Sequence, residues 1–253
     1  MNVFFQEELS IKDYAKAIVD LIGFNKKFDL CLDRSNWKFG DKDINYLVLS
    51  WRINKKISLP LMFVDLDKAG NSNTAERLDL LEAFHEVFGF HRIKSLMADR
   101  EFIGKKWFEL LNKNKIPYFI RVKENTLLPW GKDNPIQVKK LFQHLKWGEN
   151  RLILKEMYGH SVYFAGTPIK TGALVIVMSN QDLKAKQILD KYRDRWSIGV
   201  SREAHISKLV KVRPRLKGSR PRSLGGTMAR KQDGEALRQH FLKGGWAKLQ
   251  VVT

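Results

Sequence analysis

Two aspartates stand where their carboxylates could do chemistry. Asp33 lies in "CLDRSNW" and Asp99 in "SLMADREF", each at the end of an apolar, strand-like run and each followed by arginine. Carboxylates are the hard oxygen ligands that Mg²⁺ prefers, and a pair of them can hold the ion against phosphate oxygens. An aspartate at a strand end can also be a solvated turn residue. The functional interpretation therefore depends on whether the two strands are neighbours.

The runs around these aspartates predict the elements that would position them. Three β-rich runs come first, "KFDLCLDRSNWKFG", "INYLVLSWRI" and "ISLPLMFVDLD", with the hairpin signal "NKK" between the last two. Pro60 indicates an edge strand or a bulge in the third run. A helix is predicted over "NSNTAERLDLLEAFHEVFG", capped by Asn73 with Glu76 and ended by Gly89. A strand "RIKSLMAD", a helix "KKWFELLNKN" and a strand "IPYFIRVK" follow.

The order β-β-β-α-β-α-β predicts an α/β fold with a mixed sheet. Its first three strands are antiparallel and its later strands join by right-handed crossovers, which is the ribonuclease H-like order. In such a sheet the first and fourth strands are neighbours, so Asp33 and Asp99 are expected to converge at one edge. The predicted parts are a helical segment or linker over 1–28, the core over 29–126, a β-rich insertion over 127–180, the start of a further helix over 181–198, and an irregular basic tail over 199–253.

The charge of the chain indicates a polyanionic partner. The formal net charge is +19 over 253 residues, and nucleic acid is the commonest partner of so basic a protein. A ribosomal, a membrane-surface or a merely solubilising role of the charge is the alternative. Residues 199–253 hold 13 Lys and Arg against 3 Asp and Glu, with 7 of the 17 glycines and one isoleucine. This abrupt change after Ile198 favours a frameshifted or rearranged end, and a native basic DNA-binding arm is the alternative.

Other features limit the class of protein. The single cysteine, Cys31, excludes an internal disulfide, suits a reducing cytoplasm and is expected to pack in the core, as is Trp107. No apolar run reaches the roughly 18 residues that span a membrane, and the first residues do not form a signal peptide. The histidines lack the spacing of a zinc site, and no phosphate-binding glycine loop occurs.

Four segments, "LDRSNWKFG", "LDKAGNSNT", "ADREFIGKKWF" and "YRDRWSI", carry a family resemblance. In this order and spacing, over roughly residues 3–198, the chain resembles the DDE transposases of bacterial insertion sequences, in the insertion-sequence-4 type group with the YREK signature. The resemblance implies a ribonuclease H-like fold and Mg²⁺- or Mn²⁺-dependent cutting of element ends, followed by joining of the 3′ ends to a target. Asp33 and Asp99 match the first two of the family's three acids. The implied partners are double-stranded DNA and a second copy of the chain on that DNA.

The signature itself is only half present. Tyr192 and Arg195 match its first two positions, but its glutamate position falls on Gly199 and its lysine position on Ile206. Glu203 would lie on the same helix face as Gly199 but about 6 Å further along. Metal ligation tolerates displacements of only a few tenths of an ångström, so Glu203 is expected to be a weak substitute. Lys208, two positions beyond Ile206, is expected to be a coincidence.

Several basic residues are candidate DNA contacts. Arg100, Arg121 and Lys123 stand at or near strand ends, where a solvated rim charge is the alternative. Arg195 could bind phosphate through its planar fork, with Tyr192 stacking or hydrogen bonding beside it. Transposases of this group usually carry a helical end-recognition domain before the first catalytic strand. Because about 28 residues precede that strand here, specific recognition of element ends is not expected.

Taken together, these residues predict a cytoplasmic, nucleoid-associated insertion-sequence transposase that is inactive because Gly199 replaces its third acid. Three alternatives stay open. The first is an active nuclease or transposase that uses Glu203. The second is a non-catalytic DNA-binding remnant or regulator derived from a transposase. The third is an unstable relic that does not accumulate.

Overall fold

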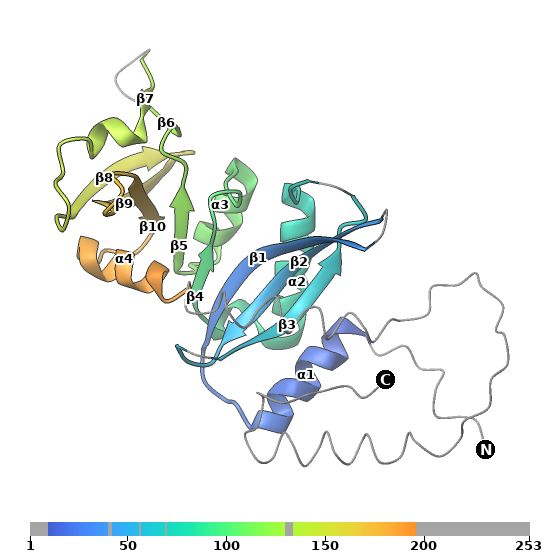
Figure 1. Cartoon of the computed structure of the whole chain (residues 1–253). Coiled ribbons are helices and arrows are strands. Elements are labelled where there is room, and N and C mark those ends of the chain that lie inside the picture. Colours follow the sequence, from blue (N-terminus) through green and yellow to red (C-terminus); the bar gives the residue numbers. More distant parts are fainter. Residues whose placement is uncertain (1–9, 40–41, 56, 69, 130–133, 196–253) are drawn as a thin grey trace, which may run out of the picture. The chain divides into compact units, whose positions relative to one another are not determined.

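The computed structural model of the chain describes residues 10–39, 42–55, 57–68, 70–129 and 134–195 (Figure 1). The predictions that concern Gly199, Glu203, Ile206, Lys208 and the tail 199–253 lie outside these residues. The elements are α1 (Ile11–Ile22), β1 (Phe28–Phe39), β2 (Lys42–Arg52), β3 (Ser58–Asp65), α2 (Thr74–Phe88), η1 (Phe90–Arg92), β4 (Ile93–Ala98), α3 (Lys105–Lys113), β5 (Tyr118–Val122), β6 (Leu127–Leu128), β7 (Ile136–Gln137), η2 (Val138–Leu141), β8 (Arg151–Met157), β9 (His160–Pro168), β10 (Leu174–Ser179) and α4 (Ala185–Arg193).

The central sheet has the strand order β3-β2-β1-β4-β5-β10-β9-β8. Strands β1, β2 and β3 form an antiparallel meander, and β4 and β5 are parallel to β1, joined through α2 and α3. This arrangement confirms the predicted ribonuclease H-like order, because each parallel connection contains a helix as crossovers require.

Strand β1 (Phe28–Phe39) occupies nearly the whole of the predicted β-rich run, so it continues past the point where it was expected to end. Asp33 does not end it, because residues beyond Asp33 continue to pair with β2 as far as Phe39 and Lys42. What ends near Asp33 is the pairing with β4, whose last pair is Leu32 with Ala98. Asp33 and Asp99 are therefore the next residues on two adjacent parallel strands, as the strand order predicted.

The segment between residues 127 and 180 is β-rich, as expected, and most of it enlarges the central sheet. Strand β10 pairs antiparallel with β5, and β9 and β8 follow it outward. Among the described strands, only β6 and β7 form a separate two-stranded sheet. The domain boundaries given above remain predictions.

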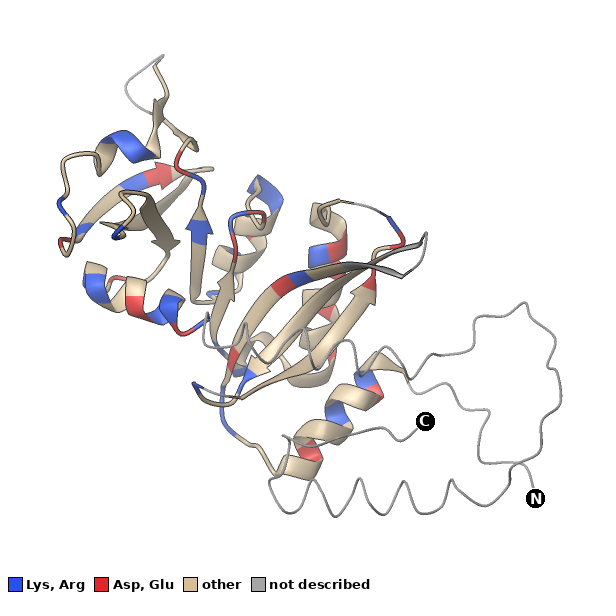
Figure 2. Cartoon of the chain, viewed as in Figure 1, with Lys and Arg blue, Asp and Glu red and all other residues tan. Residues whose placement is uncertain are grey.

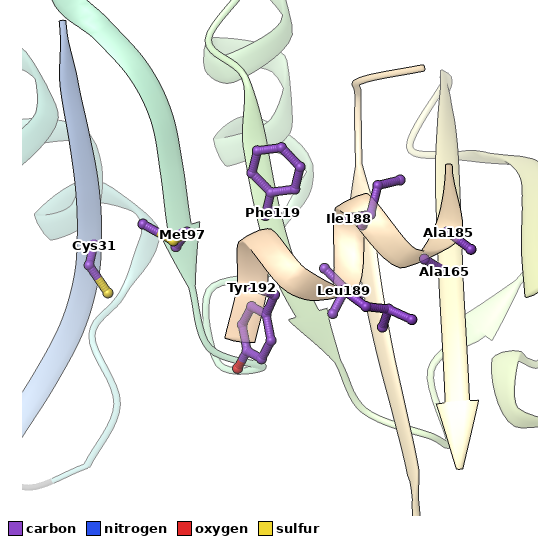
Figure 3. Packing of buried hydrophobic residues seen from close by; sticks show 9 residues of the cluster. Cys31, Met97, Phe119, Ala165, Ala185, Ile188, Leu189 and Tyr192 are labelled. Carbon is purple, nitrogen blue, oxygen red and sulfur yellow. The ribbon is translucent and has the colours of Figure 1, made fainter. Parts of the chain in front are cut away.

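The two faces of the sheet are covered by different helices. Side chains alternate between faces along a strand, so Cys31, Met97 and Phe119 of three neighbouring strands share one face. Figure 3 shows α4 lying across this face with Leu189 and Tyr192 among them. On the opposite face α2 and α3 pack with aromatic contacts, Phe28 against Phe84 and Phe108 against Tyr118. Cys31 and Trp107 are buried, as predicted.

Local signals in the sequence position α2 and β3. Asn73 and Glu76 form the predicted capping box, which satisfies free amide groups at the start of α2, and Gly89 follows its end. Strand β3 is an edge strand with a register shift near Pro60, as proline in a sheet requires. Helix α1 packs against β3, where the Tyr14 hydroxyl donates to the Pro60 carbonyl at 3.4 Å.

Candidate active site

Asp33 and Asp99 lie on the α4 face of the sheet, one position beyond the last β1–β4 pair. Their alternation with Cys31 and Met97 places both carboxylates on the same face as the end of α4. Both side chains are partly exposed, 23% for Asp33 and 33% for Asp99. The structure thus brings together the two acids that the sequence singled out, at a site that solvent or a ligand can reach.

The end of α4 completes this site with Arg195 and Tyr192. The Arg195 Nη2 atom lies 3.0 Å from Asp33 Oδ1 and 3.7 Å from Asp99 Oδ2. Its Nη1 donates to the Tyr192 hydroxyl at 3.3 Å, and that hydroxyl donates to Asp99 Oδ1 at 3.3 Å. One guanidinium therefore bridges the two carboxylates, with the tyrosine as a second link to Asp99.

Burial makes this arrangement electrostatically strong. The Arg195 side chain is 8% exposed, and its Nε has no hydrogen-bond partner among the described residues. Burial by itself would lower the pKa of Arg195, but interactions with Cys31, Tyr192 and Asp99 outweigh it and the pKa is raised. Burial raises the pKa of Tyr192 to about 12; Arg195 opposes this rise and Asp99 adds to it. At neutral pH Arg195 is charged, and the Tyr192 hydroxyl keeps the proton that it donates to Asp99.

A second buried arginine fastens the end of α4 to the sheet. Arg52, at the end of β2 and 8% exposed, pairs with Asp194 at 3.2 Å and with Asp29 at 3.6 Å. Asp29 also accepts a hydrogen bond from Ser95 and pairs with Lys94. Burial alone would raise the pKa of Asp29, but these partners lower it overall. This cluster anchors the turn that carries Arg195, so the position of Arg195 over the aspartates is fixed through the backbone.

On the opposite face, a second network holds the backbone next to each aspartate. Arg34 follows Asp33 and pairs with Glu101, two residues after Asp99, at 3.3 Å. Arg34 also donates to Asn45, whose side-chain amide donates to the carbonyls of Lys68 and Gly70. The segments that carried the sequence resemblance are thereby joined around the site.

The predicted DNA contacts fall into two groups. Arg121 is half-buried on the face of the sheet that also carries Phe119, and its charge acts to lower the pKa of Tyr192. Arg100 and Lys123 are exposed, and with Arg121 they line one cavity next to Asp99. All three therefore lie at the edge of the site, while Tyr192 and Arg195 lie within it.

Asp33 and Asp99 fit a divalent metal ion as two of its ligands. They provide hard carboxylate oxygens on adjacent strands, and the guanidinium between them shows that the position favours a positive charge. Within the described residues no group of three or more His, Cys, Asp or Glu side chains forms a metal site. Further oxygen ligands would have to come from water, from a phosphate or from residues outside the described part.

Sequence reasoning missed Arg52, Arg34, Glu101 and Lys139, the last of which lines the cavity beside Asp99. A signal existed for two of them, since Arg34 and Glu101 belong to the same motifs as the aspartates. Arg52 and Lys139 carry no such signal, because their roles arise from contacts between distant elements.

Comparisons with known proteins were made for sequence and for structure. No curated protein sequence matches the chain at a significant level. The cryo-EM structure of a piggyBac transposase synaptic complex with hairpin DNA is 13% identical with a TM-score of 0.48, covering 96% of this chain and 55% of that one, so this chain spans about half its length. The crystal structure of the NurA nuclease from Sulfolobus solfataricus is 12% identical with a TM-score of 0.30, covering 81% of this chain and 94% of that one.

Within the described residues, no helix is both long and apolar enough to cross a membrane.

The sequence of the chain matches one family profile. Residues 52–198 match the profile described as "Transposase DDE domain", a stretch that contains Asp99, Tyr192 and Arg195 and begins after Asp33. Since more than half of its length matches this profile, the chain belongs to the DDE transposase domain family.

Proposed function

We propose that the protein is an insertion-sequence transposase of the YREK group that cuts DNA strands and transfers their 3′ ends at Asp33 and Asp99. We further propose that this chain has lost that activity, because Gly199 stands where the third carboxylate would be. The observation that carries the proposal is the convergence of the two aspartates with Tyr192 and Arg195 on one face of the sheet.

The geometry supports phosphate chemistry at this site. Asp33 and Asp99 would hold Mg²⁺ or Mn²⁺, which when bound neutralises charge on the phosphate oxygens and activates the attacking oxygen. Arg195, which lies beside both carboxylates, could offer its guanidinium fork to a phosphate. The Tyr192 hydroxyl holds the orientation of Asp99 through its hydrogen bond.

The proposed loss of activity rests on spacing and on where the family match ends. Gly199, four residues after Arg195, stands at the glutamate position of the signature and has no carboxylate to offer. The match to the transposase profile ends at residue 198, which is also where the composition changes. A site with two of three acids lacks much of the electrostatic stabilisation that phosphoryl transfer needs.

The test is restoration of the missing groups. Supercoiled plasmid would be incubated with the full chain and with the Gly199→Glu, Ile206→Lys double variant in Mg²⁺ or Mn²⁺, and nicked product would be measured. We expect the parent to nick no faster than the background without protein. The double variant should nick at least about a hundredfold faster than that background, since a missing metal ligand or charge stabiliser costs that much or more. Adding Asp99→Asn to the double variant should abolish the gain.

Two outcomes would overturn parts of the proposal. Nicking by the parent that disappears with Asp99→Asn would show that Gly199 does not disable the site. If Glu203→Gln also removed the nicking by the parent, Glu203 would be the third acid. Absence of nicking in every variant would overturn the proposal that the residues at positions 199 and 206 alone account for the loss of activity.

One observation favours a second candidate, a non-catalytic DNA-binding protein derived from a transposase. The Arg195 guanidinium fills the position between the two aspartates, so the site is electrostatically satisfied without an added ion. Such a protein would act on double-stranded DNA on the bacterial nucleoid, as a homodimer, and would bind it without forming any metal-dependent product.

A further inference from the structure

A polar cavity lies beside the aspartate pair. It has a volume of about 240 Å³ and is lined by Arg100, Arg121, Val122, Lys123, Glu124, Asn125 and Lys139. It adjoins the candidate active site, because Arg100 directly follows Asp99 and Arg121 influences the pKa of Tyr192. Figure 2 shows basic residues on β5, on the loop that follows it and on η2, the elements that form this cavity.

The charges of the cavity are unbalanced. Four of the seven lining residues are cationic, and within the described part of the chain none of these four forms an ion pair. The one acidic lining residue is Glu124, whose carboxylate accepts a hydrogen bond from the backbone of Leu174 at 3.1 Å. Like charges gathered in this way repel one another unless an anion lies between them.

The cavity is held in place by backbone contacts between η2 and the loop that follows β5. The amide of Lys139 donates to the Glu124 carbonyl at 3.0 Å, and the amide of Val138 donates to the Thr126 carbonyl at 2.8 Å. Val138 and Phe142 are buried, so η2 is anchored while the Lys139 side chain stays exposed at the cavity. A preformed arrangement of this kind loses little freedom when a ligand binds.

We infer that this cavity is a second phosphate subsite. It would hold the phosphate group next along the DNA strand from the phosphate at Asp33 and Asp99. The inference rests on the proposed function, because that function supplies the DNA strand. Guanidinium forks and ammonium groups are the usual partners of phosphate oxygens. Lys139 is in this view a positioning residue, which ties the β-rich segment to the DNA at the active site.

A matched pair of variants isolates the contribution of the cavity. Lys139→Gln and Lys140→Gln each remove one exposed positive charge from η2, and only Lys139 lines the cavity. The full chain and both variants would be titrated with a short DNA duplex in EDTA over a range of salt concentrations. We expect Lys139→Gln to bind several-fold more weakly and to reduce the slope of log affinity against log salt by about 1, with Lys140→Gln close to the parent.

The outcomes separate this inference from the proposed function. Equal effects of the two substitutions would overturn the subsite, because they would reflect general charge rather than a contact. Because EDTA prevents metal-dependent cleavage, a slope change confined to Lys139→Gln would support the subsite even if the restored variant never nicked DNA. Nicking with no difference between the lysine variants would sustain the proposed function alone. Thermal melting of both variants would verify that each is folded.

Discussion

At the scale of single residues, Arg195 lies between Asp33 and Asp99, the two carboxylates that we propose as metal ligands. Its Nη2 lies 3.0 Å from one carboxylate and 3.7 Å from the other. A buried guanidinium and a bound ion cannot share this position, because both would be cations at short range. The side chain therefore stabilises the folded chain and, under the proposed function, would compete with metal binding.

Replacing Arg195 by Gln should separate these two roles. We expect unfolding free energy to fall by about 2 kcal/mol, because two partly exposed carboxylates lose their partner, and Mn²⁺ affinity to rise several-fold. Urea unfolding measures the first quantity and the electron paramagnetic resonance of bound Mn²⁺ the second. The control is Arg193→Gln, whose side chain is 73% exposed and pairs with Asp190, and it should change stability by less than about 0.5 kcal/mol. Unchanged or weaker Mn²⁺ binding by Arg195→Gln would contradict the competition.

Tyr192 predicts how stability depends on alkaline pH. Its pKa is raised from 10.0 to about 12, so the folded state holds the phenolic proton more tightly than the unfolded state does. This contribution is complete below about pH 10 and is lost as pH rises towards 12. Tyr192→Phe should cost about 1 kcal/mol at neutral pH, through the lost hydrogen bond, but should show a shallower fall in stability above pH 10. Urea unfolding at pH 8 and pH 11 tests this, and parallel declines in parent and variant would exclude it.

At the scale of elements, the end of α4 depends on Arg52 for its position. Arg52→Ala leaves the buried parts of Asp29 and Asp194 without their shared partner and should lower the free energy of unfolding by about 3 kcal/mol. The comparison is Lys94→Gln, which removes an exposed partner of Asp29 and should cost less than about 1 kcal/mol. Equal losses in urea unfolding would mean that Arg52 is no more than another surface charge.

Strand β9 and η2 approach each other closely at Gly166. A Cβ atom at this position would lie 2.4 Å from the ring of Phe142, which is buried and anchors η2. Gly166→Ala should therefore destabilise the protein by about 1–3 kcal/mol and displace the turn that carries Lys139. Gly104→Ala, where the nearest atom would be 3.5 Å away, is the control and should lower the melting temperature less, because it disturbs only the N-cap of α3 and causes no clash.

The elements also show which features the sequence could predict. The capping of α2 by Asn73 and the edge position of Pro60 depend on local chemistry, so short patterns predicted them. The meeting of Asp33 with Asp99 followed from strand order alone. The pairing of β10 with β5, the Arg52–Asp194 pair and the Lys139 cavity could not be predicted, because they depend on contacts between distant segments.

At the scale of the whole molecule, the surplus of basic residues determines how the chain should meet DNA. With 46 Lys and Arg against 27 Asp and Glu, the chain attracts a polyanion at long range before any specific contact forms. Contacts to phosphates release condensed counterions, and this release makes the affinity fall steeply with salt.

We therefore expect the full chain to bind duplex DNA of unrelated sequences with similar affinity. If six or more phosphates are contacted, this affinity should fall roughly a thousandfold or more between about 50 and 200 mM salt. Fluorescence anisotropy with two unrelated duplexes measures both properties, and EDTA should leave the binding unchanged because a phosphate contact needs no metal ion. Affinity that hardly varies over this range would mean that phosphate contacts are not the main source of binding. A strong preference for one duplex at every salt concentration would instead require base contacts, which the basic surplus alone does not provide.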